Sequence, residues 1–297
     1  MYPLLKASIN IFGKLIYYLP HCILHFWCYL LAILFLVFQK KRRLLLYQNL
    51  RGCFPQHKSF ELCRIGIIST ARTIEQGLLL FAWPNLSSKR LKKMFQLSSD
   101  HESKLKAKVQ SMNGCLWLIP HFCHADALSI LPHYMGENHH VNALYRPLGN
   151  PILNNFLRTS RERFGVSTID RKRGGMLRTL RVLKKGNILA MLFDQNAGGA
   201  GTRMQFMGKE CSCTGLPDIL YEKYKPRILF VYTRRIGFWK SQIQVEEMDH
   251  PEKGKLVIEH ANKWLEDKLK QDVALCETWL WLHQRWKPLV GKKAQIK

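Results

Sequence analysis

Acidic residues are scarce in this chain of 297 residues. Asp and Glu together number 21, against 46 Lys and Arg, so the formal net charge is +25 at pH 7. So large an excess of one sign requires an anionic partner, which can be a nucleic acid, an acidic membrane surface, a phosphorylated substrate or an acidic protein. The charge alone does not distinguish among these four.

A disulfide framework is also lacking. The cysteines number nine, an odd count, and they are scattered along the chain. Cys22, Cys28 and Cys115 stand in apolar runs, where a free thiol behaves as a small hydrophobic side chain. This pattern places the bulk of the chain in a reducing compartment.

Internal repeats and low-complexity linkers are absent as well. Hydrophobic residues make up 47% of the chain and aromatic residues 11%, which excludes global disorder and provides for a core. A chain of this length forms one large α/β domain or two small ones.

Charged residues are missing from Leu15–Phe38, a run of 24 residues. At about 1.5 Å per residue, a helix of this length is long enough to cross a hydrocarbon core of about 30 Å. The cations of Lys40–Arg43 follow directly and indicate the side that faces the cytoplasm and anionic lipid. Residues 1–43 are therefore predicted to be a membrane anchor with a basic flank, and residues 44–297 a globular domain. Because Pro20 interrupts the run, both a spanning and a monotopic anchor stay open.

Two other interpretations of this run compete with the anchor. A signal peptide is disfavoured because no small-residue cleavage site follows, and because the basic residues come after the apolar core rather than before it. A buried core helix is the remaining alternative.

Apolar and amphipathic segments alternate along the rest of the chain. Strands are predicted over 115–120, 141–146, 165–171, 187–195 and 227–235, and the apolar residues of 115–120 and 187–195 are typical of buried strands. Helical spacing of apolar residues predicts helices over 44–50, 61–81, 89–109, 125–134, 151–164, 174–185, 255–270 and 272–281, although 255–260 also has strand character. This order predicts an α/β fold with a mixed, largely parallel sheet flanked by helices.

Polar residues stand where the predicted strands end. His121, Arg146, Arg171 and Asp194 all occupy such positions. In open α/β sheets, ligands bind at the carboxyl ends of the strands. We therefore expect these four side chains to converge on one site.

The segment "HFCHAD" places His121 and Asp126 five residues apart, directly after the apolar run "CLWLIP". On one continuous helix they would lie about 140° apart and would not meet. A strand–loop–helix connection allows the Asp126 carboxylate, at a helix N-terminus, to accept a hydrogen bond from Nδ1–H of His121. Nε2 then remains basic and can remove a proton from a substrate hydroxyl.

Several simpler interpretations of this segment stay open at this point. Asp126 can be a capping residue beside an incidental histidine, and His124 can be a bystander. Cys123 as a covalent nucleophile is disfavoured, since proximity to the imidazoles is its only support. A zinc site that combines these histidines with Cys211 and Cys213 is also disfavoured, because a single residue separates the two thiols.

Longer motifs carry a family resemblance. "PHFCHAD", "YRPLGNPILNNFLRTSRERFG", "STIDRKRGGMLRTLRVLKKGNILAMLFDQNAGG", "MQFMGKECSCTGLP" and "ETWLWLHQRWK" occur in the order and at the separations of one family. The chain resembles the late acyltransferases of lipid A biosynthesis, within the lysophospholipid acyltransferase superfamily. The resemblance covers about Leu15 to Lys287, and it implies that residues 44–297 are an acyltransferase domain.

The resemblance also implies an activity. The family moves a fatty acyl chain from acyl carrier protein to a hydroxyl of a phosphorylated glycolipid, at the cytoplasmic face of the bacterial inner membrane. It uses no metal or other cofactor. By motif position His121 is expected to be the general base and Asp126 its orienting acid. Many lipid A members carry Glu at the position of Asp126, whereas the wider superfamily carries Asp.

The same resemblance implies substrate-binding residues. Arg171 matches the superfamily's substrate-binding block, Arg161 and Arg163 match an arginine pair, and Asp194 with Gln195 matches a "DQ" that ends a strand near the dyad. Guanidinium groups suit phosphate because they bind it through two parallel hydrogen bonds. Arg146 joins this group through its place at a strand end.

Two other functions remain as alternatives. A sister enzyme of the same superfamily would acylate a glycerophospholipid or another glycolipid, and the motifs do not separate it from a lipid A enzyme. A membrane-tethered nucleic-acid-binding protein would also suit the charge, but the sequence has no zinc-finger spacing and no aromatic–basic ribonucleoprotein motif. We therefore expect lipid and carrier-protein partners rather than nucleic acid.

Overall fold

The computed structural model describes residues 2–109, 114–135, 140–172, 174–249, 251 and 254–287. Its N-terminal part is helical, with α1 (Tyr2–Tyr18), α2 (His21–Phe38), α3 (Lys40–Cys53) and α4 (Ser59–Ala82), followed by the short 3₁₀ helix η1 (Trp83–Asn85). The single helix expected over 15–38 is divided at Leu19 and Pro20. Proline has no backbone N–H and clashes with the preceding turn, so Pro20 does not continue α1 and instead stands directly before α2 as its N-cap.

Seven strands form the main sheet. They are β1 (Phe95–Leu97), β2 (Cys115–Ile119), β3 (Val141–Tyr145), β4 (Ser167–Asp170), β5 (Ile188–Leu192), β8 (Arg227–Gly237) and β9 (Lys240–Glu247), in the order β1-β9-β8-β2-β5-β3-β4. Strands β8, β2, β5, β3 and β4 run parallel, whereas β9 pairs antiparallel with β8. The prediction of a mixed, largely parallel sheet is confirmed.

Two apolar layers sandwich the sheet. Along β2, Cys115, Trp117 and Ile119 pack into one layer, and Leu116 and Leu118 pack into the other. A strand that is buried on both faces needs apolar side chains at every position, which explains the unbroken apolar runs in the sequence.

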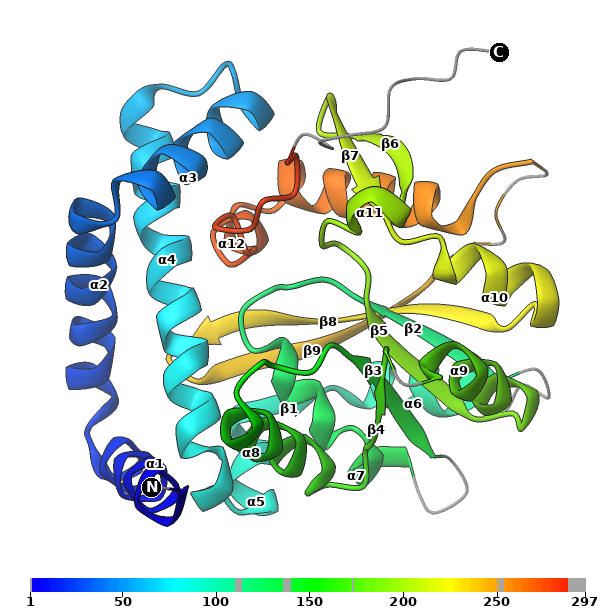
Figure 1. The fold of residues 1–297 in the computed structure, drawn as a ribbon, viewed down its shortest axis with the longest axis horizontal. Coiled ribbons are helices and arrows are strands. Elements are labelled where there is room, and N and C mark those ends of the chain that lie inside the picture. Colours follow the sequence, from blue (N-terminus) through cyan, green and yellow to red (C-terminus); the bar gives the residue numbers. More distant parts are fainter. Residues whose placement is uncertain are drawn as a thin grey trace.

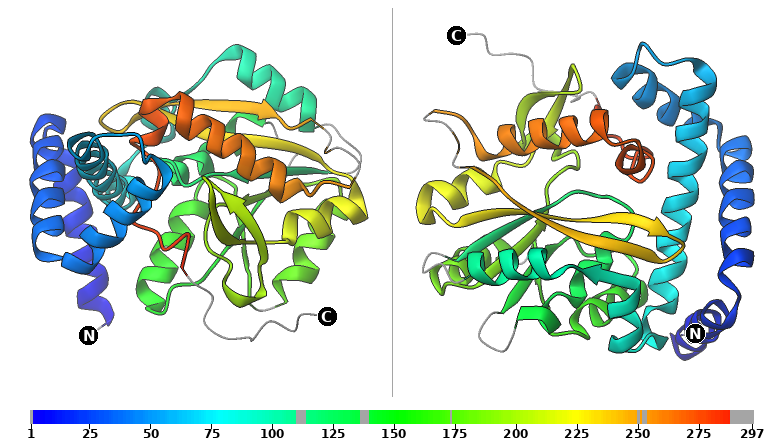
Figure 2. Two further views of the ribbon diagram at one scale, coloured as in Figure 1. Left: turned by 90° about the horizontal axis from the view of Figure 1, so that it is seen from above. Right: turned by 180° about the vertical axis from the view of Figure 1, so that it is seen from behind.

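Helices cover both faces of the sheet (Figures 1 and 2). One side carries α5 (Ser88–Met94), α6 (Ser99–Val109), η2 (Ala125–Ile130), α7 (Pro132–Met135) and α8 (Pro151–Glu162). The other carries α9 (Gly175–Lys184), α10 (Leu216–Tyr224), α11 (Val257–Gln271), α12 (Val273–Cys276) and the hairpin of β6 (Thr202–Phe206) and β7 (Lys209–Cys213). Helix α4 stands at the end of the sheet, across the carboxyl ends of the parallel strands.

Some local predictions were wrong. The helix expected over 89–109 is interrupted by β1, because Phe95 is fully buried and pairs with Ser241 of β9. The segment 125–134 is helical, but most of it is 3₁₀. The helix expected over 272–281 stops at Cys276, and the β6–β7 hairpin was not foreseen. The helical prediction for 255–270 is confirmed by α11.

Helix α2 has the length and the composition needed to cross a membrane, with a mean hydropathy of 2.2 over its 18 residues. Within the described parts of the chain, no other helix meets both criteria. In the fold, α2 packs lengthwise against α4, with its buried side chains on one stripe.

Candidate active site

The register of two neighbouring strands brings His121 and Asp194 together. In the parallel pair β2–β5, Ile119 lies opposite Leu192. This pair ends both strands, and two residues further along each chain segment His121 and Asp194 lie side by side beyond the edge of the sheet. The side chains therefore meet because the strands are adjacent in space, although 73 residues separate them in the chain.

Asp194 is bound to His121 by two hydrogen bonds. Its Oδ1 lies 2.5 Å from Nδ1 of the imidazole, and its Oδ2 accepts the backbone N–H of His121 at 2.8 Å. Nε1 of Trp279 donates a third bond to Oδ2 at 2.7 Å. Burial on its own would raise the pKa of Asp194, but His121 and these donors lower it to about 2. The carboxylate is thus ionised, and it favours the tautomer with hydrogen on Nδ1.

The second ring nitrogen of His121 faces the open side. The side-chain amide of Gln195 lies 2.9 Å from Nε2, which in this tautomer carries a lone pair and accepts the amide hydrogen. The His121 side chain is 19% exposed, compared with 1% for Asp194. The pair therefore has a buried acid and an accessible base.

The predicted hydrogen bond between His121 and Asp126 does not form. The Asp126 carboxylate instead accepts Nε of Arg161 at 2.7 Å and Nε2 of Gln76 at 3.1 Å. Burial alone would raise the pKa of Asp126, but Arg161 and Gln76 hold it below its usual value. His124 begins η2 with a left-handed backbone (φ 69°), and this turn directs Asp126 toward α8 and α4. The acid nearest in sequence is therefore not the acid on Nδ1.

The loop between His121 and Asp126 is held from behind by α4. Gln76 accepts the backbone N–H of His124 at 2.9 Å and donates to Asp126, so a single side chain holds both ends of the turn. His124 is fully buried; its Nδ1 lies 2.8 Å from Ser241 Oγ, and its Nε2 lies 3.2 Å from Glu75. Cys123 is buried beside them, and burial raises the pKa of its thiol well above the usual value. These surroundings suit packing rather than a nucleophile or a base.

A cavity of about 680 Å³ opens in front of His121. Its inner wall is apolar and includes Trp117, Val141, Val166 and Ala190, all of them buried core residues. Its mouth is basic, with Arg146, Arg161 and Arg171 among the lining residues. Three of the predicted arginines therefore share the cavity with His121, Asp126 and Gln195.

Arg163 does not belong to this cavity. Its guanidinium donates to the backbone oxygen of Trp83 at 2.9 Å and stacks on the ring of Phe164. Arg161 lies in the last turn of α8 and Arg163 is the residue that caps this helix, so the two side chains point in different directions and have different surroundings. Arg163 is therefore not among the residues that line the cavity, and its contacts stabilise the fold.

Sequence reasoning missed four residues around the site. Gln76 and Trp279 bind the two carboxylates, as described above. His283 lines the cavity and accepts the backbone N–H of Asn196 at 2.8 Å, and burial lowers its pKa to about 4. Arg285 is fully buried and donates to the backbone oxygen of Gln195 at 2.7 Å. The motif "ETWLWLHQRWK" contains three of the four, but it was used only as part of the family resemblance.

A zinc site that joins the histidines to Cys211 and Cys213 does not form. In the described ranges, the one set of three potential metal ligands within 4.8 Å of one another is Glu75, Cys123 and His124. Glu75 is already paired with Arg72 at 2.9 Å and with Arg235 at 3.1 Å. Two guanidinium groups at the same carboxylate disfavour a cation there.

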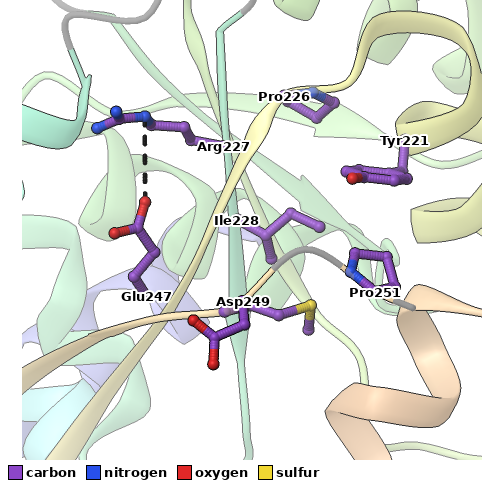
Figure 3. A pocket seen from close by; sticks show the side chains of 8 residues that line it. Tyr221, Pro226, Arg227, Ile228, Glu247, Asp249 and Pro251 are labelled. Atoms are coloured by element: carbon purple, nitrogen blue, oxygen red, sulfur yellow. Dashed lines mark ion pairs between the residues drawn. The ribbon is translucent and has the colours of Figure 1, made fainter. Parts of the chain in front are cut away.

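A second hollow, of about 280 Å³, lies at the opposite edge of the sheet, where β8 begins. Figure 3 shows Arg227 and Glu247 beside it, joined by an ion pair of 4.0 Å, with Tyr221 and Asp249 also in its wall. These groups are close to the amino end of β8 rather than to the carboxyl ends that carry His121. We therefore place the candidate active site in the larger cavity.

Comparison with known proteins identifies the family of the chain. A search of curated proteins returned no significant match. A family model described as bacterial lipid A biosynthesis acyltransferase matches residues 5–288, which include most of α1, all of α2, the whole sheet and all the residues of the site. The resemblance seen in the sequence motifs is confirmed over nearly the entire chain. The chain belongs to the bacterial lipid A biosynthesis acyltransferase family.

Proposed function

We propose that this protein transfers a fatty acyl chain from the thioester of acyl carrier protein to a hydroxyl of a phosphorylated lipid A precursor. We place the reaction at the cytoplasmic face of the bacterial inner membrane. The observation that carries the proposal is the His121–Asp194 pair at the mouth of a cavity with an apolar interior and an arginine rim. Membership of the family supplies the reaction class.

His121 is the general base in this proposal. Asp194 accepts the hydrogen of Nδ1, so Nε2 can take the proton of the acceptor hydroxyl when that group replaces the amide of Gln195. The alkoxide attacks the thioester carbonyl and forms a tetrahedral oxyanion. When this collapses, the C–S bond breaks, the ester remains on the lipid, and the thiolate takes the proton back from the imidazolium.

Gln195 is our candidate for stabilising the oxyanion. Its amide N–H groups lie at Nε2 of His121, next to the point where the reaction would occur. Arg285 fixes the backbone oxygen of this residue from the buried side. A preorganised donor at that position would act without the reorganisation that water requires.

Asp126 has a different role from the one expected. It is the ion-pair partner of Arg161, and together they form part of the cavity wall. We propose that Asp126 orients Arg161 for a phosphate of the acceptor, with Arg146 and Arg171 at the same rim. We propose that Asp194, rather than Asp126, orients His121. Arg163 is no longer proposed to bind the substrate.

The apolar depth of the cavity is the proposed site for an acyl chain. Trp117, Val141, Val166 and Ala190 present hydrocarbon to its interior, where an extended chain would lose contact with water. The acidic carrier protein would approach from outside, and the excess of positive charge favours that encounter.

A direct assay tests this function. The full chain in detergent is incubated with acyl carrier protein thioesters and a tetra-acylated lipid A precursor, and the product is weighed by mass spectrometry. We expect one added acyl chain and a roughly 10²–10⁴-fold lower rate in the His121→Ala variant. Acylation of lysophosphatidic acid instead of the glycolipid would point to a sister enzyme, and near-wild-type turnover of His121→Ala would refute the mechanism.

A further inference from the structure

Helices α1 and α2 leave a large apolar surface uncovered. The exposed side chains are Ile11, Phe12, Leu15 and Tyr18 on α1, and Ile23, Phe26, Trp27, Leu31, Ile33, Leu34, Phe35, Val37 and Phe38 on α2. The opposite stripe of α2, made of Leu24, Cys28, Ala32 and Leu36, is buried against the protein. A contiguous apolar face of this extent marks an interaction site.

Buried polar contacts fix α2 to the catalytic domain. Arg72 of α4 donates to the Tyr29 hydroxyl of α2 at 2.7 Å and also meets Nε2 of His25 at 3.3 Å. The same guanidinium is paired with Glu75, which is fully buried and also binds Arg235 of β8. Separating α2 from α4 would leave this buried ion network without part of its partners, which is costly.

The two ends of the helical layer are fixed as well. At the start of α2, the His21 ring lies 5.3 Å from the ring of Phe238 and 5.4 Å from that of Trp239, in the β8–β9 turn. On α1, Gly13 faces the backbone oxygen of Phe81 so closely that a Cβ there would lie 2.3 Å from it. This contact requires glycine, and it brings α1 against the end of α4.

This attachment is incompatible with a spanning α2. If α2 ran along the membrane normal, its partner α4 would have to enter the hydrocarbon beside it, together with the charged Arg72–Glu75–Arg235 network and the β8–β9 turn.

Cations border the apolar face. Lys40, Lys41, Arg42 and Arg43 are all exposed at the start of α3, one residue after the end of α2, and Lys14 is exposed on α1. Apolar helices that lie in a membrane interface combine such a hydrocarbon-facing side with basic residues at the level of the lipid phosphates. The charge therefore complements an anionic lipid surface.

We infer that α1 and α2 form an in-plane docking surface for one leaflet of an anionic bilayer, and that α2 does not cross the membrane. The axis of α2 lies parallel to the bilayer, with its outer side chains in the upper acyl region. Because the parallel strands point their carboxyl ends toward α4, and Gln76 of α4 lines the active-site cavity, docking places that cavity one helix away from the lipid (Figure 1). The statement that this cavity is the active site rests on the proposed function, whereas the orientation of α2 in the membrane does not.

The depth of spin labels along α2 tests this inference. The exposed Cys22 and Cys63 are replaced by Ser, and Cys is introduced singly at Tyr18, Phe26 or Phe38, all of which are exposed. Each labelled full-length protein is reconstituted into vesicles of phosphatidylglycerol and phosphatidylethanolamine. Relaxation by oxygen and by an aqueous nickel chelate then reports the depth, and Lys185→Cys, on the turn after α9, is the aqueous control.

We expect positions 26 and 38 to lie at about the same depth, roughly 5–10 Å into the headgroup and acyl boundary. A spanning helix would separate them by about 18 Å, with one near the midplane. Such a gradient would overturn the inference, as would labels that are all in water. Replacing Lys40–Arg43 by Gln should weaken vesicle binding by roughly fivefold per charge. None of these readouts depends on acyl transfer, so failure of the proposed reaction would leave them intact.

Discussion

Two carboxylates flank the candidate base, and they occupy contrasting surroundings. Asp194 leaves the end of β5, is 1% exposed and receives all its hydrogen bonds from His121 and Trp279. Asp126 lies on η2, is 19% exposed and receives its bonds from Arg161 and Gln76. The first environment orients an imidazole, and the second orients a guanidinium at the cavity rim. The comparison shows that the register of neighbouring strands, rather than closeness in sequence, determines which acid binds the imidazole of His121.

The largest expected difference is between the amide variants of these two acids. Asp194→Asn should lower kcat by roughly 10²–10⁴-fold, because an amide no longer favours the tautomer with hydrogen on Nδ1. Asp126→Asn should lower kcat by less than about tenfold and raise KM for the lipid acceptor, because Arg161 loses its partner. Steady-state kinetics of both variants would measure the split. Equal losses of kcat would contradict the separation of roles.

Trp279 offers a second way to sharpen the comparison. Trp279→Phe removes the donor to Asp194 and should lower kcat by about tenfold, with a loss of about 1.5–3 kcal/mol in the free energy of unfolding. Trp281→Phe is the matched control, since its indole is equally buried but donates to the backbone oxygen of Cys276. The control should lose stability without the same fall in kcat. Unchanged kcat in Trp279→Phe would show that the indole of Trp279 does not contribute to catalysis through Asp194.

The free energy of unfolding should fall at acidic pH, and Asp194 should account for part of this fall. Its pKa is about 2 in the folded protein and near 3.8 in the unfolded chain, so the unfolded state binds more protons between these values. This contribution is present above about pH 4 and is lost as the pH falls toward 2. It amounts to about 2 kcal/mol. Thermal unfolding from pH 5 to pH 2 should therefore show a shallower slope for Asp194→Asn, and identical slopes would contradict the lowered pKa.

Gln76 is expected to give the smallest effect. Gln76→Ala removes the hydrogen bonds to His124 and Asp126, and it should lower kcat by roughly three- to tenfold as the turn between His121 and Asp126 loosens. Gln48→Ala, at an exposed position of α3, is the control and should have no effect. If Gln76→Ala changed only the stability and left kcat and KM unaltered, α4 would have no positioning role.

Much of the fold followed from the sequence because the central strands are buried on both faces. Their apolar runs revealed β2, β3, β5 and β8, and the alternation with helices gave a largely parallel sheet. Strand β1 escaped detection because it has three residues and exists only through pairing with β9, about 146 positions away along the chain. The β6–β7 hairpin was not predicted because its polar and apolar residues follow the two-residue period of a half-buried strand for only four positions in each strand, the shortest run that indicates one.

The site was only partly predictable, for a related reason. Strand ends are visible in a sequence, so His121, Arg146, Arg171 and Asp194 were all found. Which acid meets His121 depends on the order of strands in the sheet, and the sequence alone favoured the near neighbour Asp126. Gln76 gave no local signal, because a glutamine in an amphipathic helix is ordinary.

The most direct test of the central claim observes the proton between His121 and its acid. In protein labelled with ¹⁵N-histidine, the Nδ1–H resonance of His121 is assigned by its loss in His121→Ala. We predict a strongly downfield proton on Nδ1 that disappears in Asp194→Asn and persists in Asp126→Asn. A resonance that survives in Asp194→Asn and vanishes in Asp126→Asn would contradict the account.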